Sequence, residues 1–175
     1  MSDYIIRKAE SKDAEEYIRL NNFVWRDAYK HIFPEEVFLE RESRAEYKIK
    51  NFDSIYYNNN DGIAYVAEHD GKIVAIMLGR IISDYEYFKN KNYADLQALY
   101  VHPEHQGRGL AGKLKNIFIQ WAKENNAKNF VIGVLKDNFK ARTVYEKWGG
   151  KLEDFSQPFV MLDKGYEEVF YTYEI

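Results

Sequence analysis

Three glycines are the residues of this sequence best suited to bind a ligand: Gly107, Gly109 and Gly112. They lie in a polar turn between an apolar segment, Leu96–Val101, and an amphipathic segment, Leu110–Trp121. A backbone without side chains at the start of a helix can direct several N–H groups and the positive end of the helix dipole at an anion. This stretch therefore predicts a binding loop for a phosphate or pyrophosphate group.

The same glycines match two further phosphate-binding patterns, and the neighbouring residues argue against both. The G-x-x-x-x-G-K loop of nucleotide triphosphatases needs Ser or Thr after its lysine to hold magnesium, but Leu114 stands there. The G-x-G-x-x-G loop of dinucleotide-binding folds follows its strand almost directly, with an acidic residue about 20 residues further on. Here a polar segment separates Val101 from Gly107, and Asp137 is too distant to bind the ribose.

A third pattern, the pyrophosphate loop Q/R-x-x-G-x-G/A, is satisfied by Gln106, Gly109 and Ala111. This pattern expects a gap like the observed one after the strand, with a proline early in it, here Pro103. The residues after the loop form one apolar stripe that would pack a helix on a sheet: Leu110, Leu114, Ile117, Phe118 and Trp121.

Length and composition bound the class of protein. A chain of 175 residues predicts one domain, 1–175, and a hydrophobic content of 46% excludes a disordered chain. No apolar run approaches the roughly 18 residues of a membrane span, and a net charge of −3 without a basic run argues against nucleic acid as a partner. Because cysteine and a signal sequence are both lacking, we expect a cytoplasmic protein.

The hydrophobic pattern predicts strands and helices that alternate along the chain. Helices are expected from an N-cap at Ser11, from Pro34, from Gly109 and from Asn138, and polar loops over 53–62 and 83–92. Hairpins precede the central strand and two strand–helix units follow it, so we predict an α/β fold with a mixed sheet and helices on both faces. The expected strands are Tyr4–Arg7, Ile63–Glu68, Lys72–Ile82, Leu96–Val101, Asn129–Leu135, Lys151–Phe155 and Glu168–Tyr173.

Two motifs in this order resemble the signatures of the GNAT superfamily of N-acetyltransferases. LYVHPEHQGRGLAGKL is similar to the strand–loop–helix signature, and the segment from Asn138 to Gly150 is similar to the second signature. Gly150 stands where an aromatic residue often follows Gly149, and Gln97 stands where many relatives carry glutamate. The resemblance implies a mostly antiparallel central sheet of about six to seven strands, flanked by helices on both faces.

The resemblance also implies a site for acetyl-CoA. The pantetheine arm would lie between two diverging strands and pair with the backbone of Leu99 and Val101, and the pyrophosphate would rest on N–H groups of the glycine-rich loop. The residues that the resemblance assigns to the cofactor are Leu99, Tyr100, Val101, Gln106, Gly107, Arg108, Gly109, Leu110, Ala111, Gly112, Lys113, Asn138, Ala141, Tyr145 and Lys147.

The resemblance implies direct attack of an amine on the thioester. Tyr145 lies where the family keeps a hydroxyl near the departing sulfur, and a phenol with an ordinary pKa near 10 can donate a proton. The backbone N–H of Val101 would stabilise the oxyanion. Gln97 cannot accept a proton, so the base is left to Asp95, which would share a strand face with Gln97, or to Glu68 on a neighbouring strand; either could act through a water.

Other assignments stay open at this point. Trp25 and Tyr29 can wall a substrate cleft or simply pack in the core, and His102 and His105 lack an evident third metal ligand, so no metal site is expected. The acceptor is a small-molecule or peptide amine, without nucleic acid or membrane as a partner, and a homodimer fits the resemblance. The alternative function is a catalytically silent module that binds acyl-CoA as a sensor.

Overall fold

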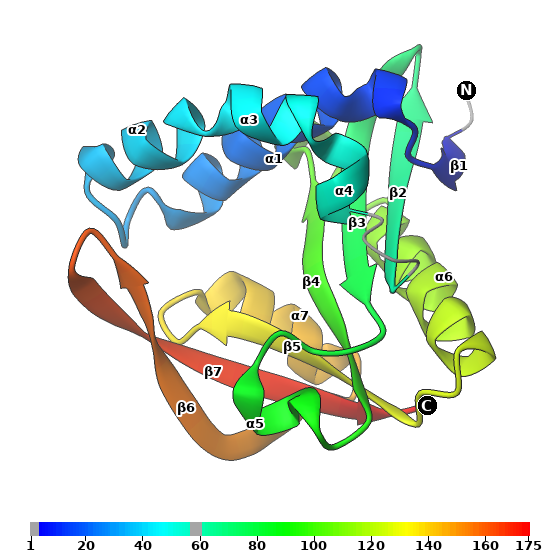
Figure 1. Cartoon of the computed structure of the whole chain (residues 1–175), viewed down its shortest axis with the longest axis vertical. Coiled ribbons are helices and arrows are strands. Elements are labelled where there is room, and N and C mark those ends of the chain that lie inside the picture. The colour runs from blue at the N-terminus through cyan, green and yellow to red at the C-terminus, as the bar shows by residue number, and fades with distance from the viewer. Residues whose placement is uncertain (1–3, 57–60) are drawn as a thin grey trace.

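The computed structural model describes residues 4–56 and 61–175. In these residues seven strands form one sheet in the order β1-β2-β3-β4-β5-β7-β6 (Figure 1). The strands are β1 Ile5–Lys8, β2 Gly62–His69, β3 Lys72–Arg80, β4 Tyr93–Val101, β5 Asn129–Leu135, β6 Lys151–Met161 and β7 Lys164–Glu174. All neighbouring strands are antiparallel except β4 and β5, so the predicted mixed, mostly antiparallel sheet is confirmed.

One face of the sheet is covered by α6 (Leu110–Glu124) and α7 (Phe139–Lys147). The stripe of α6 expected from the sequence is inside: Leu110, Leu114 and Phe118 are fully buried against β3, β4 and β5. Phe118 packs directly over Gly79 of β3, where a Cβ atom would come within 2.4 Å of the ring. This close fit fixes α6, and with it the glycine-rich loop at its start, relative to β4.

The opposite face is covered by four helices that precede β2 and by one short helix before β4 (Figure 1). They are α1 (Ala14–Tyr29), α2 (Glu35–Ser43), α3 (Ala45–Lys50), α4 (Phe52–Tyr56) and α5 (Glu86–Lys89). Tyr17 and Ile18 of α1 pack on Val66 and Ile76, while Phe88 of α5 packs on Val131 and Phe170. Helices therefore lie on both faces, as the sequence predicts. No helix in the described ranges is long and apolar enough to cross a membrane.

Four local expectations were wrong. Ser11 is not the N-cap of α1: it begins a 3₁₀ turn (Ser11–Asp13), and its hydroxyl donates to Asp53. The expected loop 53–62 contains most of α4 and the start of β2, apart from 57–60, which lie outside the described residues. The expected loop 83–92 contains α5. The last two strands continue into one long hairpin, because Leu162 and Asp163 both adopt positive φ and close a two-residue turn.

A candidate ligand site where two strands diverge

Strands β4 and β5 separate soon after they begin, and this opening is the centre of the candidate site (Figure 1). Their parallel ladder pairs Tyr93–Asp95 with Asn129–Val131 and ends at the pair Asp95–Val131. Beyond this pair, β4 continues along β3 and β5 continues along β7. We call the opening between residues 96–101 and 132–135 the β4–β5 fork. Its two sides are strand edges that can hydrogen-bond an extended ligand.

The backbone of Leu99 and Val101 points into the fork. The N–H of His102 donates to the carbonyl of Val74 at 2.8 Å, so in the antiparallel β3–β4 ladder the alternate residues Val101 and Leu99 turn their N–H and C=O groups away from β3. The carbonyl of Val101 accepts a hydrogen bond from the side chain of Gln106 at 3.0 Å. These backbone groups lie where the sequence analysis places the contacts with a pantetheine arm.

The glycine-rich loop is open to a ligand at the start of α6. Gly107 and Gly109 have φ of 74° and 79°, and no heavy atom lies within 4 Å of the position of a Cβ at Gly107, Gly109 or Gly112. The first turn of α6 leaves the N–H groups of Leu110, Ala111 and Gly112 without intrahelical acceptors. Together with the helix dipole, these donors suit a pyrophosphate.

Side chains around the loop hold it against its neighbours. Arg108 folds back, donating to the hydroxyl of Tyr4 at 3.0 Å and to the carbonyl of Glu104 at 3.2 Å. Lys140 of α7 donates to the side chain of Gln106 at 2.8 Å, which links the loop to the second motif. Lys113 is exposed at the loop. As placed here, Arg108 stabilises the loop from within, and its expected phosphate contact stays a prediction.

Helix α7 brings Tyr145 close to the fork. Asn138 caps the helix by accepting from the N–H of Ala141 at 3.1 Å. Tyr145 packs inward, and burial, with smaller contributions from Tyr100 and Tyr173, raises the pKa of its hydroxyl. The phenol therefore stays protonated over the physiological range and can act as a proton donor. Lys147, by contrast, is exposed at the end of α7.

The hydroxyl of Tyr173 on β7 explains the unusual Gly150. This hydroxyl donates to the carbonyl of Tyr145 at 3.0 Å and ties α7 to the sheet. A Cβ at position 150 would lie 2.6 Å from the same hydroxyl and 2.9 Å from the Tyr145 carbonyl. Only glycine leaves room for this bond.

A β-bulge at Gln97 overturns the expectation that Asp95, Gln97 and Leu99 share a face. In the β3–β4 register Ala98 pairs with Leu78 and Leu96 pairs with Gly79, so Gln97 is an extra residue. Residues before Gln97 therefore point to the opposite face from the one that regular alternation would give. Asp95 lies on the face covered by α1 and α5, opposite to Leu99. Gln97 itself donates to Asp84 at 2.6 Å.

Asp95 lies at the vertex of the fork and is only 1% exposed. One carboxylate oxygen accepts from the hydroxyl of Ser83 at 3.0 Å, and the other, Oδ1, is buried without a partner among the described residues. Burial raises the pKa of Asp95 to about 7, while the Ser83 hydrogen bond opposes that rise and the nearby Asp84 adds to it. A carboxyl group with this pKa can bind and release a proton near neutral pH.

The expectation that Glu68 lies on a strand next to β4 was wrong. Glu68 is on β2, and β3 lies between β2 and β4. Glu68 forms an ion pair with Arg7 at 3.1 Å, and the same guanidinium pairs with Asp13 at 2.6 Å. This placement, away from the fork and neutralised by a cation, does not suit a base.

Trp25 and Tyr29 are both buried, but their surroundings differ. Trp25 stacks on Phe33 with a centroid separation of 5.0 Å, and the guanidinium of Arg41 lies over the Trp25 ring, 4.5 Å from its centroid. Tyr29 reaches the end of the fork, where Tyr100, Tyr145, Asn138 and Glu168 influence its hydroxyl, and burial raises its pKa. Contact with substrate stays a prediction for both, and the geometry favours Tyr29.

The sequence analysis missed two polar residues on this face, Tyr85 and Glu168. The hydroxyl of Tyr85 donates to Glu168 at 2.9 Å, and Gln157 donates to the other carboxylate oxygen at 3.1 Å. Tyr85 lies in a segment interpreted as a solvated loop, and Glu168 lies at the start of an expected strand. The available signal for Glu168 in the sequence was a charged residue directly before the mostly apolar run 169–173.

The expectation that His102 and His105 lack a third ligand was wrong, since Glu104 lies beside them. One possible ligand atom from each of the three residues lies within 4.8 Å of the others. The ring nitrogens already take part in the loop, however: Nδ1 of His102 accepts from the N–H of Glu104 at 3.3 Å, and Nδ1 of His105 bonds to Tyr4 at 3.0 Å. These contacts order the turn before the glycine-rich loop.

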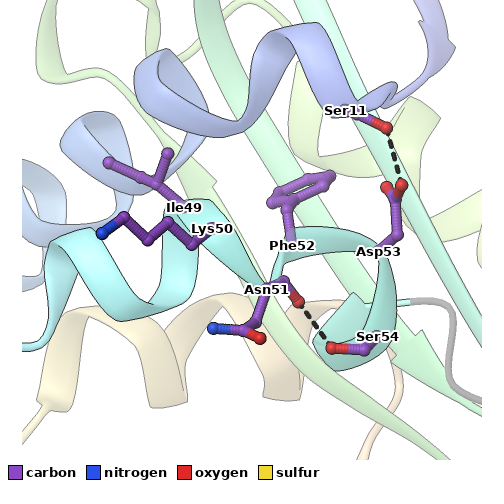
Figure 2. A pocket seen from close by; sticks show the side chains of 7 residues that line it. All are labelled: Ser11, Ile49, Lys50, Asn51, Phe52, Asp53 and Ser54. Atoms are coloured by element: carbon purple, nitrogen blue, oxygen red, sulfur yellow. Dashed lines mark hydrogen bonds between the residues drawn. The ribbon is translucent and has the colours of Figure 1, made fainter.

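A separate hollow of about 290 Å³ lies away from the fork, at α3 and α4 (Figure 2). It is lined by Ser11, Ile49, Lys50, Asn51, Phe52, Asp53 and Ser54. Two hydrogen bonds, from Ser11 to Asp53 and from Ser54 to the Asn51 carbonyl, account for polar groups on its rim. Neither the backbone edges nor the glycine-rich loop reaches it, so we place the candidate site at the fork.

Known acetyltransferases resemble this chain in sequence and in structure. The model of the acetyltransferase (GNAT) family matches residues 7–150. A protein of Archaeoglobus fulgidus, described as an uncharacterized N-acetyltransferase, is 28% identical over 144 residues, which cover 80% of this chain and 88% of that protein.

Two solved structures share the fold. The paiA N-acetyltransferase from Thermoplasma acidophilum, in complex with coenzyme A, has a TM-score of 0.73 and 22% identity, covering 98% of this chain and 99% of that one. The structure of yncA from Salmonella typhimurium, with its cofactor acetyl-CoA, has a TM-score of 0.67 and 18% identity, covering 99% and 94%.

Proposed function

Because the chain belongs to the acetyltransferase (GNAT) family, we propose that it is an N-acetyltransferase that moves the acetyl group of acetyl-CoA to a primary amine of a small molecule or peptide. The observation that carries this proposal is the β4–β5 fork, whose free backbone edge at Leu99 and Val101 leads directly to the open loop at 106–112. Structures similar to this chain were solved with coenzyme A and with acetyl-CoA, which supports the same ligand here.

The residues present fit such a ligand in two ways. The N–H groups of Leu110, Ala111 and Gly112 would hold the pyrophosphate, because the glycines of the loop leave open space and Arg108 folds back onto Tyr4 and Glu104. The N–H and C=O groups of Leu99 and Val101 would pair with the amides of the pantetheine arm, as an added strand would. Bound acetyl-CoA supplies an activated acyl thioester.

Two groups of this chain would then act on the thioester. The N–H of Val101 would donate to the thioester oxygen as negative charge develops there, a contribution worth about 10²–10³ in rate for one such donor. The amine nitrogen forms a bond to the acyl carbon as the carbon–sulfur bond breaks. The hydroxyl of Tyr145, which its raised pKa keeps protonated, would donate its proton to the departing sulfur as general acid and regain a proton from solvent.

The proton of the attacking ammonium group must leave before or during the attack, and Asp95 is the better of the two expected bases. It lies at the vertex of the fork with a pKa of about 7, and one of its carboxylate oxygens has no hydrogen-bond partner among the described residues. Glu68 on β2, in contrast, is ion-paired with Arg7. Because six residue steps along β4, or roughly 15–20 Å, separate Asp95 from Val101, a chain of waters would have to connect Asp95 to the amine, and Gln97, on the bulge between them, would help to orient those waters.

A thermal-shift titration with acetyl-CoA, followed by thiol-detected release of CoA with a panel of amines, tests the proposal. Acetyl-CoA should raise the melting temperature, and Gly109→Glu should abolish the rise, because it adds a side chain and a negative charge where the pyrophosphate binds. Gly71→Glu is the matched control: Gly71 has a φ of 74°, similar to that of Gly109, and open surroundings in the β2–β3 turn.

Equal loss of the acetyl-CoA shift in both variants would mean that backbone strain, rather than the loop, causes the effect. Stabilisation by ATP or NAD, but not by acetyl-CoA, would overturn the proposed ligand. A protein that binds acetyl-CoA and releases no CoA with any amine would instead support the silent binding module.

A further inference from the structure

Two buried carboxylates lie on the same face of the sheet at the vertex of the β4–β5 fork. Asp95 is the last residue of β4 in the parallel ladder and pairs with Val131. Glu168 on β7 pairs with Leu135 on β5, and its carboxylate reaches back to Gly133, two residues or about 6.6 Å beyond Val131 along the strand. The hydroxyl of Tyr85 donates to Glu168 at 2.9 Å, and burial raises the pKa of this hydroxyl, with the nearby charge of Asp95 adding to the rise.

Neither carboxylate is neutralised by a cation. Glu168 is 6% exposed and Asp95 1%, yet no ion pair of the described residues includes either one. Their hydrogen bonds come from neutral donors: Ser83 for Asp95, and Tyr85 and Gln157 for Glu168. Burying a carboxylate without a cation is costly, so a positive charge brought by a ligand would satisfy a need that the protein leaves open.

Gly133 makes room for this arrangement. A Cβ atom on Gly133 would lie 2.4 Å from the hydroxyl of Tyr85 and 2.8 Å from Oε1 of Glu168, so any side chain would displace both. The polar groups therefore pass over bare backbone on the β5 side of the fork. Oδ1 of Asp95, buried and unpartnered, lies on the β4 side. The pair thus lines the vertex end of the β4–β5 fork.

Resting on the proposed function, we infer that Glu168 is the binding group for a second positive charge on the acceptor, while Asp95 serves the amine that reacts. The acceptor class is then a flexible amine with another cationic nitrogen a few carbons away, as in a linear diamine or a lysine side chain next to a free amine. An acceptor with a carboxylate at that distance would meet Glu168 and be repelled.

The guanidinium of Arg41 in this region donates one hydrogen bond, and its Nε is buried without a partner among the described residues. Arg41 of α2 lies close enough to influence the hydroxyl of Tyr100, but its guanidinium stacks on Trp25 and donates to Asn21 at 2.9 Å. Glu168, in contrast, has only neutral donors. The charges of the described residues around the fork therefore favour a cationic acceptor over a zwitterionic one.

The test compares three acceptors of similar length by thiol-detected CoA release: butane-1,4-diamine, n-pentylamine and 4-aminobutanoate. In the parent enzyme kcat/KM should be about 10- to 100-fold higher for the diamine than for pentylamine, as expected for a hydrogen-bonded charge in a buried site, and lowest for the aminobutanoate. Glu168→Gln keeps the size of the side chain and should remove most of the preference for the diamine, mainly through KM, while pentylamine changes little.

Glu167→Gln is the matched control, since Glu167 is the adjacent residue, exposed and paired with Lys136 at 2.8 Å. It should leave the ratio between diamine and pentylamine unchanged. Tyr85→Phe keeps the ring that packs on Phe170 and removes only the donor to Glu168, so it should weaken the diamine preference in part.

An equal ratio for diamine and pentylamine in the parent enzyme, a measurement that needs no variant, would overturn the inference. So would a Glu168→Gln protein that binds acetyl-CoA normally and keeps the full preference. In both cases acetyl transfer itself persists and the proposed function stands. If acetyl-CoA neither stabilises the protein nor releases CoA with any acceptor, the proposed function fails and the inference fails with it.

Discussion

The buried carboxyl of Asp95 makes protein stability depend on pH in a direction that can be worked out in advance. Its pKa rises from 3.8 to about 7 on folding, because burial disfavours the charged form. Between these two values the unfolded chain has lost the proton and the folded protein still holds it. Stability therefore falls as pH rises from about 4 to about 7, and above pH 7 the folded protein carries the full cost of the buried charge.

The magnitude follows from the size of this shift. Each pH unit between the two pKa values is worth 1.36 kcal/mol, so the gap of about three units corresponds to about 4 kcal/mol as an upper value. Asp95→Asn has nearly the same shape and cannot ionise, and its amide oxygen can still accept from Ser83. The variant should consequently gain free energy of unfolding relative to the parent as pH rises from 5 to 8, by about 2–4 kcal/mol.

Urea unfolding at intervals from pH 5 to pH 9 measures this difference directly, with Asp154→Asn on the exposed side of β6 as the control. The parent should also show kcat/KM rising through pH 7 as Asp95 ionises, and Asp95→Asn should lose that rise. A difference in stability between variant and parent that stays constant over this range would refute the reasoning, because it would mean that Asp95 is already charged in the folded protein at pH 5.

Two further predictions concern α7 and its attachment to the sheet. Tyr145→Phe should lower kcat by about 10²–10⁴-fold with little change in acetyl-CoA affinity, and an unchanged kcat under rate-limiting chemistry would leave Tyr145 a packing residue. Gly150→Ala should destabilise the protein by about 1–3 kcal/mol in denaturant unfolding, because its Cβ would meet the Tyr173 hydroxyl at 2.6 Å; the loss should shrink in a Tyr173→Phe background, and an equal loss there would assign the clash to the Tyr145 carbonyl instead.

Much of the fold could be predicted from the sequence because its main elements carry strong local patterns. The stripe of α6 and the continuous apolar run of β5 lie where the sequence places them, since both periodicities reflect burial on one face of a helix or on both faces of a strand. Element ends were less predictable. Ser11 has the composition of an N-cap, but the fold presents Asp53 to its hydroxyl and begins α1 three residues later.

The part of the candidate site that is formed by backbone could be predicted from the sequence. The part that depends on which face of the sheet a side chain occupies could not. Glycines before a helix are typical of an anion-binding loop, and the structure gives Gly107 and Gly109 positive φ and keeps that loop open. The face of the sheet on which Asp95 lies depends on one extra residue, the bulge at Gln97. The residue types around Gln97 do not reveal that a bulge forms there. Glu168 was missed for a related reason: its importance comes from Tyr85, which is 83 residues away in the sequence.

The bulge also has a consequence for how two ligands reach each other. The helices α6 and α7, with the glycine-rich loop, occupy one face of the sheet, and Asp95 and Glu168 lie on the other. With regular alternation, Asp95 would point under α6, on the same side as the pyrophosphate loop, and its charge would repel the ligand expected there. Because Gln97 shifts the register, a thioester held from the α6 side and an amine held from the α1 side meet only through the β4–β5 fork. In the proposed reaction this separation would keep the negative charges of Asp95 and Glu168 away from the pyrophosphate, and it would let both ligands bind at once, as direct attack requires.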